Sequence, residues 1–154
     1  MNPAATEHRE IERRFLVETA PENLSGEDFA IDQGYISVKP TVRLRRENCS
    51  RFFLTVKRGP FAVHEERKVE LSMEQFFELW PLTEGHRLHK IRRRIPWNGH
   101  VIELDTFAGQ LEGLRIAEVE FPDDKSMWDF EKPSWFGKEV TGDASYANVN
   151  LARS

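Results

Sequence analysis

Charged and apolar side chains alternate along four segments of the chain, and this alternation is the main guide to its fold. The four segments are 10–17, 42–45, 90–95 and 117–121. Successive side chains of a β-strand point to opposite faces of the sheet, so each segment places its charges on one face and its apolar residues on the other. An ordinary antiparallel sheet turns mixed polar residues toward water. Here the charges are sorted by sign, strand by strand, which suits a site for a metal-bound polyanion better than a solvated surface.

Strands dominate the predicted secondary structure. We expect eight of them, at 9–17, 31–38, 41–47, 51–58, 63–71, 87–95, 100–107 and 114–121. Turn residues make short links between many of these strands, and Asn98-Gly99 is a strong hairpin signal. Neighbouring strands should therefore pair in an antiparallel sheet.

Three helices are expected between and after the strands. Ser72 to Gln75 forms a capping box that opens the first helix, and Pro81 ends it. The apolar side of this helix would consist of Phe76, Phe77, Leu79 and Trp80. Asp123 or Asp124 caps a second helix, and a third is expected over about 143–152.

The pattern favours one fold class, a mainly β (α+β) protein. Eight antiparallel strands with few helices favour closure, because closure removes exposed strand edges. The charged face is the organised one, and large apolar residues lie opposite to it. We therefore predict a closed eight-stranded antiparallel β-barrel with a charged, wet interior and an apolar exterior covered by peripheral helices and loops.

The inward face can be assigned by parity. If Glu10 and Glu12 point inward, the same face collects eight carboxylates: Glu10, Glu12, Glu66, Glu70, Glu103, Asp105, Glu118 and Glu120. It also collects eight cations: Arg14, Arg43, Arg45, Lys57, Lys68, Lys90, Arg92 and Arg94. Burying so many charges is costly unless they are paired or bind ligands.

The sorting of these charges points to phosphoryl chemistry. Closure would bring together the carboxylates of the first, seventh and eighth strands, and oxygen ligands of this kind suit Mg²⁺ or Mn²⁺. The cations come mainly from the third, fourth and sixth strands and would face them. Metals bridge phosphate oxygens in phosphoryl transfer while Arg and Lys neutralise charge. For a single strand a solvent-facing salt-bridge ladder is the commoner arrangement; the shared phase and sign sorting of the whole set favour a site.

Composition limits the class of protein. The 154 residues predict one domain over 8–154 after a disordered tail at 1–7, and 39% apolar residues are enough for a core. The net charge of −4 provides no general basic field, so no stable nucleic-acid partner is expected. The single cysteine, Cys49, fits a reducing compartment. Without a signal peptide or a membrane span, we expect a cytoplasmic protein that does not bind membranes.

The N-terminal segment Glu10-Ile11-Glu12-Arg13-Arg14-Phe15-Leu16-Val17 resembles the ExExK signature of the CYTH, or triphosphate tunnel metalloenzyme, superfamily. Further matching segments cover nearly the whole chain in the right order: 33–36, 42–45, 54–57, 79–85, 90–92, 103–105, 118–121 and 135–141. The resemblance implies an eight-stranded barrel with a hydrophilic tunnel. It also implies a triphosphate-containing small molecule as substrate and a divalent metal. The short bacterial branch, mainly associated with tripolyphosphate hydrolysis, is most similar.

The resemblance also implies residue roles. Metal ligands, directly or through water, would be Glu10, Glu12, Asp105, Glu118 and Glu120, and parity adds Glu66 and Glu103 as candidates. Phosphates would be held by Arg43, Arg45, Lys57 and Arg92, with Arg94 added by parity. Lys90 would lie near the terminal phosphate or the attacking water, and Arg14 is the second candidate catalytic residue.

Two positions depart from the family pattern. The signature lysine is Arg14, which keeps the charge but is effectively never deprotonated. The fifth strand has Glu66-Arg67-Lys68 where the family usually has Glu-x-Glu. Lys68 therefore replaces a carboxylate and is expected to weaken a second metal site.

Three functions remain open from the sequence. The first is a metal-dependent triphosphatase that hydrolyses inorganic tripolyphosphate to pyrophosphate and phosphate, or acts on nucleoside or thiamine triphosphates. The second is a class IV-type adenylate cyclase, although no segment clearly provides a nucleoside pocket. The third is a non-catalytic polyphosphate- or nucleotide-binding module. A homodimer is also left open.

Overall fold

The computed structural model describes residues 6–59 and 63–153. Its nine strands are β1 (Thr6–Arg9), β2 (Glu12–Leu16), β3 (Asp28–Ser37), β4 (Thr41–Glu47), β5 (Arg51–Arg58), β6 (Val63–Leu71), β7 (Arg87–Trp97), β8 (His100–Phe107) and β9 (Arg115–Glu120). All pairings are antiparallel, and the strands form one sheet in the order β1-β6-β5-β4-β3-β7-β8-β9-β2.

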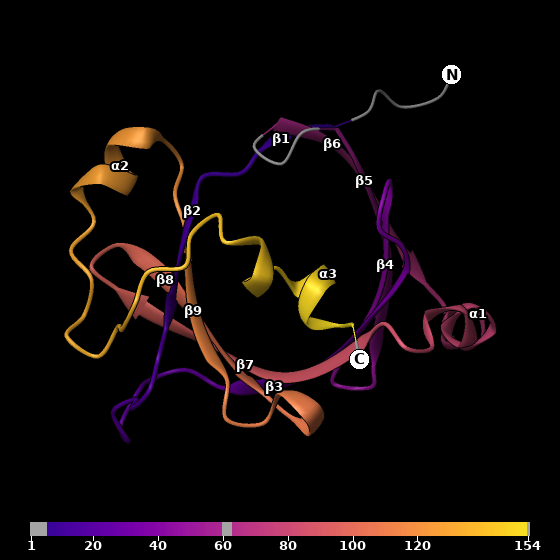
Figure 1. The fold of residues 1–154 in the computed structure, drawn as a ribbon, viewed down its shortest axis with the longest axis horizontal. Coiled ribbons are helices and arrows are strands. Elements are labelled where there is room, and N and C mark those ends of the chain that lie inside the picture. The colour runs from indigo at the N-terminus through magenta and orange to yellow at the C-terminus, as the bar shows by residue number, and fades with distance from the viewer. Residues whose placement is uncertain (1–5, 60–62, 154) are drawn as a thin grey trace.

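The two edges of the sheet are consecutive segments of the chain. β1 pairs with β6 and β2 pairs with β9, and only Glu10 and Ile11 separate β1 from β2. The strands lie around a common centre in Figure 1. Within the described residues no ladder joins β1 to β2, so the predicted closed barrel is not confirmed.

The predicted strands recur in the structure, with one division. The first expected strand, 9–17, is split into β1 and β2, which gives nine strands in place of eight. The expected tail also ends earlier than predicted, since Thr6 and Glu7 already belong to β1; residues 1–5 lie outside the described residues. The predicted hairpin at Asn98-Gly99 is confirmed. Both residues have positive φ, at 46° and 81°, as a two-residue hairpin turn with the right twist requires.

The helices are short. They are α1 (Met73–Leu79), α2 (Asp124–Asp129) and α3 (Asn148–Leu151), with 3₁₀ helices η1 (Trp80–Thr83), η2 (Gly109–Leu111) and η3 (Ala144–Tyr146). The predicted capping box at Ser72 is present, and Asp123 caps α2. The first helix ends before Pro81, as predicted: α1 stops at Leu79, and Pro81 lies in the first turn of the separate 3₁₀ helix η1, where its missing N–H is not needed. The third expected helix is divided between η3 and α3.

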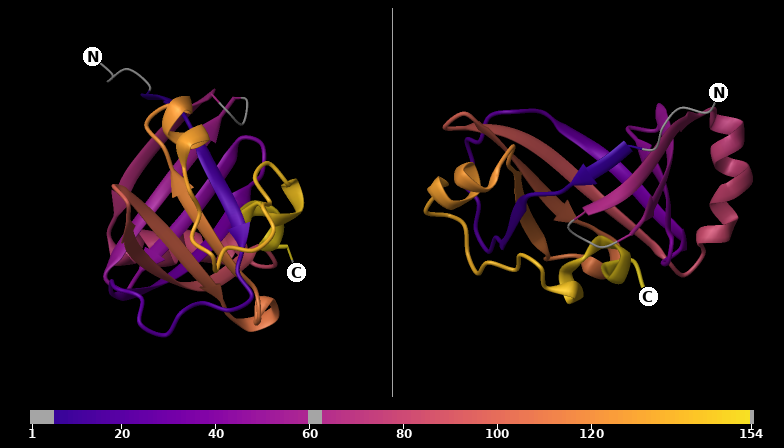
Figure 2. Two further views of the ribbon diagram at one scale, coloured as in Figure 1. Left: turned by 90° about the vertical axis from the view of Figure 1, so that its left-hand side faces the viewer. Right: turned by 90° about the horizontal axis from the view of Figure 1, so that it is seen from above.

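Most of the apolar core lies on the outer face of the sheet, as predicted. A cluster that includes Phe15, Ile102 and Val119 packs against Phe130 and Phe136 from the segment after β9. A second cluster joins Leu44 and Phe52 to Phe76 of α1. Figure 2 shows α1 outside the sheet. Phe77 differs from the expected apolar side of this helix, since it is exposed. No helix in the described ranges is long and apolar enough to cross a membrane.

The inner face is not charged along its whole length. Tyr35, Leu88, Phe107 and Ile116 form a buried cluster with Ala152, and Val149 and Leu151 pack against it. Leu88 and Ile116 share parity with the charged residues Lys90 and Glu118, so this cluster continues the same face. In Figure 1, α3 lies across the centre of the ring of strands. The C-terminal segment thus covers an apolar end of the inner face and leaves the charged part as the candidate site.

Candidate active site

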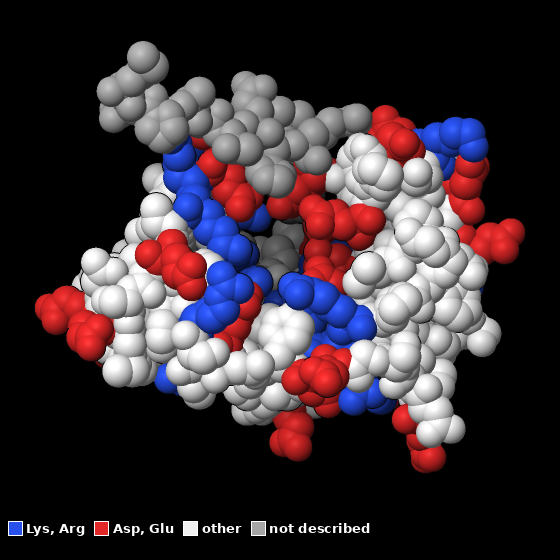
Figure 3. All heavy atoms as spheres, turned by 180° about the vertical axis from the view of Figure 1, so that it is seen from behind, with Lys and Arg blue, Asp and Glu red and all other residues white. Residues whose placement is uncertain are grey.

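A cavity of about 1350 Å³ occupies the charged part of the inner face. The view in Figure 3 shows a hollow bordered by Lys and Arg on some sides and by Asp and Glu on others. Ten of the fourteen predicted site residues line it: Glu10, Glu12, Arg14, Arg43, Arg45, Lys57, Glu66, Arg92, Glu118 and Glu120. Ten of the sixteen residues that parity assigned to the inner face therefore line one cavity.

Two carboxyl groups are in direct contact in this cavity. The side chains of Glu12 and Glu118 share a hydrogen bond, and a hydrogen bond between carboxyl groups requires one proton. Burial, that hydrogen bond and the charge of Glu118 raise the pKa of Glu12. Burial acts against ionisation of Glu118 too, but the bond from Glu12 and the charges of Arg92 and Arg14 lower the pKa of Glu118. The pair therefore holds one proton at neutral pH.

This carboxylate pair is the best candidate position for a cation. A divalent ion can replace the shared proton and remove the repulsion between two ionised carboxylates. Within the described residues no group of three His, Cys, Asp or Glu side chains is arranged to hold an ion. The arrangement still fits Mg²⁺, which is usually bound through one or two carboxylates, several waters and substrate phosphates.

Arg14 links the carboxylate pair to the C-terminal segment. Its Nη1 donates to the carbonyl oxygen of Tyr146 at 2.7 Å, and its Nε lies 3.5 Å from a carboxylate oxygen of Glu118. Its Cα is the register partner of Glu118 on β9. The neighbouring Arg13 points to the other side and forms an ion pair with Glu139 at 2.7 Å. Alternation along β2 thus separates a cavity arginine from a surface arginine.

Two arginines of β4, Arg43 and Arg45, line the cavity. The Nε of Arg43 is buried and has no hydrogen-bond partner among the described residues. Arg45 donates through Nε to the side-chain oxygen of Gln33 at 3.0 Å. Burial, together with the charges of Arg43 and Arg92, lowers the pKa of Arg45 to about 10, so it remains charged at neutral pH. A buried donor without an acceptor is costly, and an anion in the cavity would supply one.

Lys57 lies between two carboxylates of the lining. Its Nζ is 3.1 Å from a carboxylate oxygen of Glu10 and 4.0 Å from one of Glu66. Register places Lys57 opposite Glu66 on β6. The cationic and anionic walls therefore meet at this point.

The remaining four predicted residues lie beside the cavity rather than on its surface: Lys90, Arg94, Glu103 and Asp105. Asp105 receives a two-pronged ion pair from Arg92, at 2.7 and 2.9 Å, and a contact from Lys90 Nζ at 2.9 Å. Burial would raise the pKa of Asp105, but the charges of Lys90 and Arg92 lower it. Burial lowers the pKa of Lys90 to about 8 while Asp105 opposes that change.

The ion pairs around Asp105 fix the position of Arg92, which lines the cavity. Arg92 also donates to Glu103 at 3.0 Å, and the exposed Arg94 contacts the same carboxylate at 3.2 Å. Arg92 reaches the lining while its two-pronged bond to Asp105 fixes the plane of its guanidinium. Lys90 Nζ further contacts Asn148 of α3 at 3.3 Å. Asp105 and Lys90 are thus placed to orient Arg92 and the C-terminal segment.

The predicted site residues leave out several parts of the lining. These include residues 38–41 at the turn from β3 into β4, Arg58 and Gly59 at the end of β5, and the C-terminal segment 142–150, which contributes Asp143, Asn148 and Asn150. Tyr35 on β3 also lines the cavity, although parity assigned no charged residue to that strand. Position 34 on the same strand requires glycine, since a Cβ there would lie 2.7 Å from Thr83.

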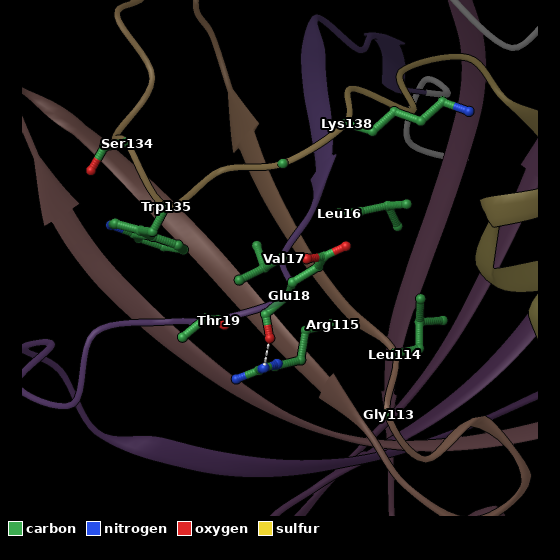
Figure 4. A pocket seen from close by; sticks show the side chains of 11 residues that line it. Leu16, Val17, Glu18, Thr19, Gly113, Leu114, Arg115, Ser134, Trp135 and Lys138 are labelled. Atoms are coloured by element: carbon green, nitrogen blue, oxygen red, sulfur yellow. Dashed lines mark hydrogen bonds between the residues drawn. The ribbon is translucent and has the colours of Figure 1, made fainter.

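A second, smaller cavity lies where the chain leaves β2, beside the start of β9. Figure 4 shows its lining, in which Leu16, Val17, Leu114 and Trp135 surround the open space. The guanidinium of Arg115 is bonded to the carbonyl oxygen of Glu18. None of the predicted site residues lines this cavity. Because the guanidinium of Arg115 is already hydrogen-bonded to a backbone carbonyl, this cavity is a weaker candidate for a polyanion.

Comparison with known proteins gives a consistent result. No family model matches the sequence. The chain is 41% identical over 153 residues to an inorganic triphosphatase of Nitrosomonas europaea, covering 94% of this chain and 97% of that protein. It is 35% identical over 150 residues to an inorganic triphosphatase of Acetivibrio thermocellus, covering 95% and 94%.

Solved structures agree in fold. The crystal structure of an inorganic triphosphatase superposes with a TM-score of 0.75 at 38% identity and covers 94% of this chain and 95% of its own. An adenylyl cyclase-like protein from Hippeastrum superposes with a TM-score of 0.57 at 15% identity, covering 77% of this chain and 82% of its own; at this identity the likeness shows a common fold.

Proposed function

Since the chain belongs to the inorganic triphosphatase family within the short bacterial branch of the CYTH superfamily, we propose that it hydrolyses inorganic tripolyphosphate to pyrophosphate and phosphate in the charged cavity. Water attacks the terminal phosphorus, the bond from that phosphorus to the bridging oxygen breaks, and pyrophosphate leaves. The curated relatives carry this activity in their names.

One observation carries the proposal. The buried Nε of Arg43 lacks a protein acceptor among the described residues, and Arg43 lines the same cavity as the proton-sharing pair Glu12 and Glu118. An unsatisfied N–H donor favours binding of an anion, and a pair of adjacent carboxyl groups favours binding of a cation. Together they suit a metal-bound polyphosphate.

The cationic side chains bind and orient the phosphates. Arg43, Arg45 and Arg92 line the cavity, and Lys57 and Arg14 complete the set. Charge-assisted bonds from guanidinium groups are strong and directional, and they neutralise charge that develops during phosphoryl transfer. Arg14 holds Glu118 beside the substrate rather than moving a proton, because arginine stays charged.

The metal would be Mg²⁺ or Mn²⁺, held by Glu12 and Glu118 with Glu10 and Glu120 acting directly or through water. When bound, such an ion polarises phosphate oxygens and neutralises their charge. Glu66 also lines the cavity and is a candidate for the same role. The sequence-based assignment of Asp105 and Glu103 as metal ligands is less favourable, because both carboxylates already form ion pairs. Asp105 pairs with Lys90 and Arg92. Glu103 pairs with Arg92 and Arg94.

Continuity of the chain from β1 to β2 supports a closed tunnel, because the two edges of the sheet are joined by Glu10 and Ile11 alone. Closure, a single domain over 8–154, a cytoplasmic location, a homodimer and the lack of a nucleic-acid or membrane partner stay predictions.

Product analysis tests the proposed function. Purified protein is incubated separately with tripolyphosphate, thiamine triphosphate and ATP in the presence of Mg²⁺ or Mn²⁺, and all products are resolved. We expect equal amounts of phosphate and pyrophosphate from tripolyphosphate, and little product in EDTA. Cyclic AMP from ATP would instead indicate a cyclase, and bound but unchanged tripolyphosphate would indicate a binding module.

A further inference from the structure

The C-terminal segment is attached to the sheet by the two side chains that the sequence identified as catalytic candidates. Arg14 of β2 donates from Nη1 to the carbonyl oxygen of Tyr146 at 2.7 Å. Lys90 of β7 donates from Nζ to the side-chain oxygen of Asn148 at 3.3 Å. β2 and β7 are not neighbours in the sheet, so the two contacts hold the segment from separate strands. The position of the segment relative to the cavity is therefore fixed at two points.

Asn148 belongs to the lining of the main cavity. It is the first residue of α3, which lies across the centre of the ring of strands in Figure 1. Further along the segment, Leu151 packs against the apolar cluster of the inner face, and Ala152, which is 0% exposed, is part of that cluster. Apolar packing thus anchors the end of the segment, and Asn148 lies where the segment borders the charged part of the face.

The orientation of the Asn148 amide follows from its partner. The ammonium group of Lys90 pairs with Asp105 at 2.9 Å, and a protonated lysine has donors only. The side-chain oxygen of Asn148 must therefore face Lys90. The amide nitrogen lies on the other branch of the same planar group and carries two hydrogens. No acceptor for them is found among the described residues.

Lys90 does not reach the cavity surface itself. It is 0% exposed and is not part of the lining, although the sequence predicted it beside the terminal phosphate. Asn148 contacts Lys90 and also lines the cavity, so its N–H groups are available where the ammonium group is not. Arg92, which shares Asp105 with Lys90, lines the same cavity. The amide is therefore placed to add a neutral donor to a wall of guanidinium groups that suits phosphate oxygens.

We propose that the side-chain amide of Asn148 donates a hydrogen bond to a phosphate oxygen of the bound triphosphate, and that Lys90 is the positioning residue that orients this amide. The inference rests on the proposed function and makes the C-terminal segment part of the substrate site. Lys90 then acts through Asn148: its buried charge determines that the nitrogen of the amide, and not the oxygen, is left to face the anion.

Two substitutions at position 148 separate the donor role from simple attachment of the segment. Asn148→Asp keeps an oxygen for Lys90 and adds a charge, but an ionised carboxylate has no N–H to donate. Asn148→Ala adds no charge, but it removes the oxygen together with the N–H groups. Loss of the donor is the change that both variants share. We expect each, with folding verified by circular dichroism, to lower kcat/KM for tripolyphosphate by about tenfold or more, the usual loss for a hydrogen bond to a charged group.

Asn23, which is exposed and outside the lining, provides matched controls. Asn23→Asp and Asn23→Ala should stay within about twofold of wild type. If the wild type is active, full activity of Asn148→Asp would show that Asn148 only attaches the segment, and full activity of Asn148→Ala would show that the added charge alone is harmful. Either result overturns the inference and leaves the proposed function standing. An inactive wild type overturns the proposed function and the inference with it.

Discussion

Glu12 and Glu118 share one proton across the inner face of two neighbouring strands. Such a pair is a weak point of the metal-free protein, because it keeps a carboxyl group protonated far above its ordinary pKa. A divalent cation would bind most readily at the same pair of carboxyl groups. The stability of the metal-free protein and the activity of the metal-bound protein should therefore respond in opposite directions when one carboxyl is neutralised.

Glu12→Gln should abolish metal-dependent turnover of tripolyphosphate and stabilise the metal-free protein. With the pKa of Glu12 raised in the folded state, the native protein binds more protons than the unfolded chain at pH 6–8, so wild-type stability falls as pH rises there. The slope approaches about 1.4 kcal/mol per pH unit at most. Melting temperatures in EDTA at pH 6 and 8 measure this difference for wild type and variant.

Glu139→Gln is the matched control for that experiment, since its carboxylate pairs with Arg13 on the outer side. It should keep metal-dependent activity. If Glu12→Gln retained wild-type turnover with both Mg²⁺ and Mn²⁺, its carboxylate would not be a metal ligand.

Arg14→Lys should keep activity within about threefold of wild type, because a cation near Glu118 is preserved. Arg14→Ala should reduce kcat/KM by at least about tenfold, since it removes a charge-assisted contact and the bond to the Tyr146 carbonyl. Arg13→Ala, on the outer side, is the control. Steady-state kinetics on tripolyphosphate compare the three variants. A large gain in turnover for Arg14→Lys would show that the position also moves a proton.

Asp105→Asn should be mainly a stability variant. It leaves the buried cations Arg92 and Lys90 without their shared carboxylate, and breaking a buried ion pair costs about 3–5 kcal/mol. Asp28→Asn breaks the exposed pair with Arg93 and should leave the free energy of unfolding close to that of wild type. Urea unfolding of both variants gives the comparison. A free energy of unfolding for Asp105→Asn equal to that of wild type would refute the supporting role of this group.

The strands and their inward face could be predicted from the sequence because both depend on a period of two. Arg43 and Arg45 face the cavity while Arg46 pairs with Asp32 on the other side, as alternation requires. The hairpin at Asn98-Gly99 followed from local backbone chemistry. These features are set by neighbours along the chain, which is why one sequence was sufficient to identify them.

The burial of individual side chains and the identity of their ion-pair partners could not be predicted from alternation. Parity placed Asp105 on the inner face but could not show that Arg92 and Lys90 enclose it, because those contacts depend on cross-strand register. Nor could parity show that α3 covers the apolar end of that face, since a short C-terminal segment has no periodic signal for its docking position.

The central claim is that the inner charged face of the sheet binds the substrate, and two adjacent arginines test it most directly. Arg45 lines the cavity, whereas Arg46 pairs with Asp32 at 2.7 Å on the opposite face. The measurement is kcat/KM for tripolyphosphate with Mg²⁺, for Arg45→Ala and Arg46→Ala variants whose folding is verified by circular dichroism. We predict a loss of at least about tenfold for Arg45→Ala and less than about twofold for Arg46→Ala. Equal losses in the two variants would contradict the assignment of the site.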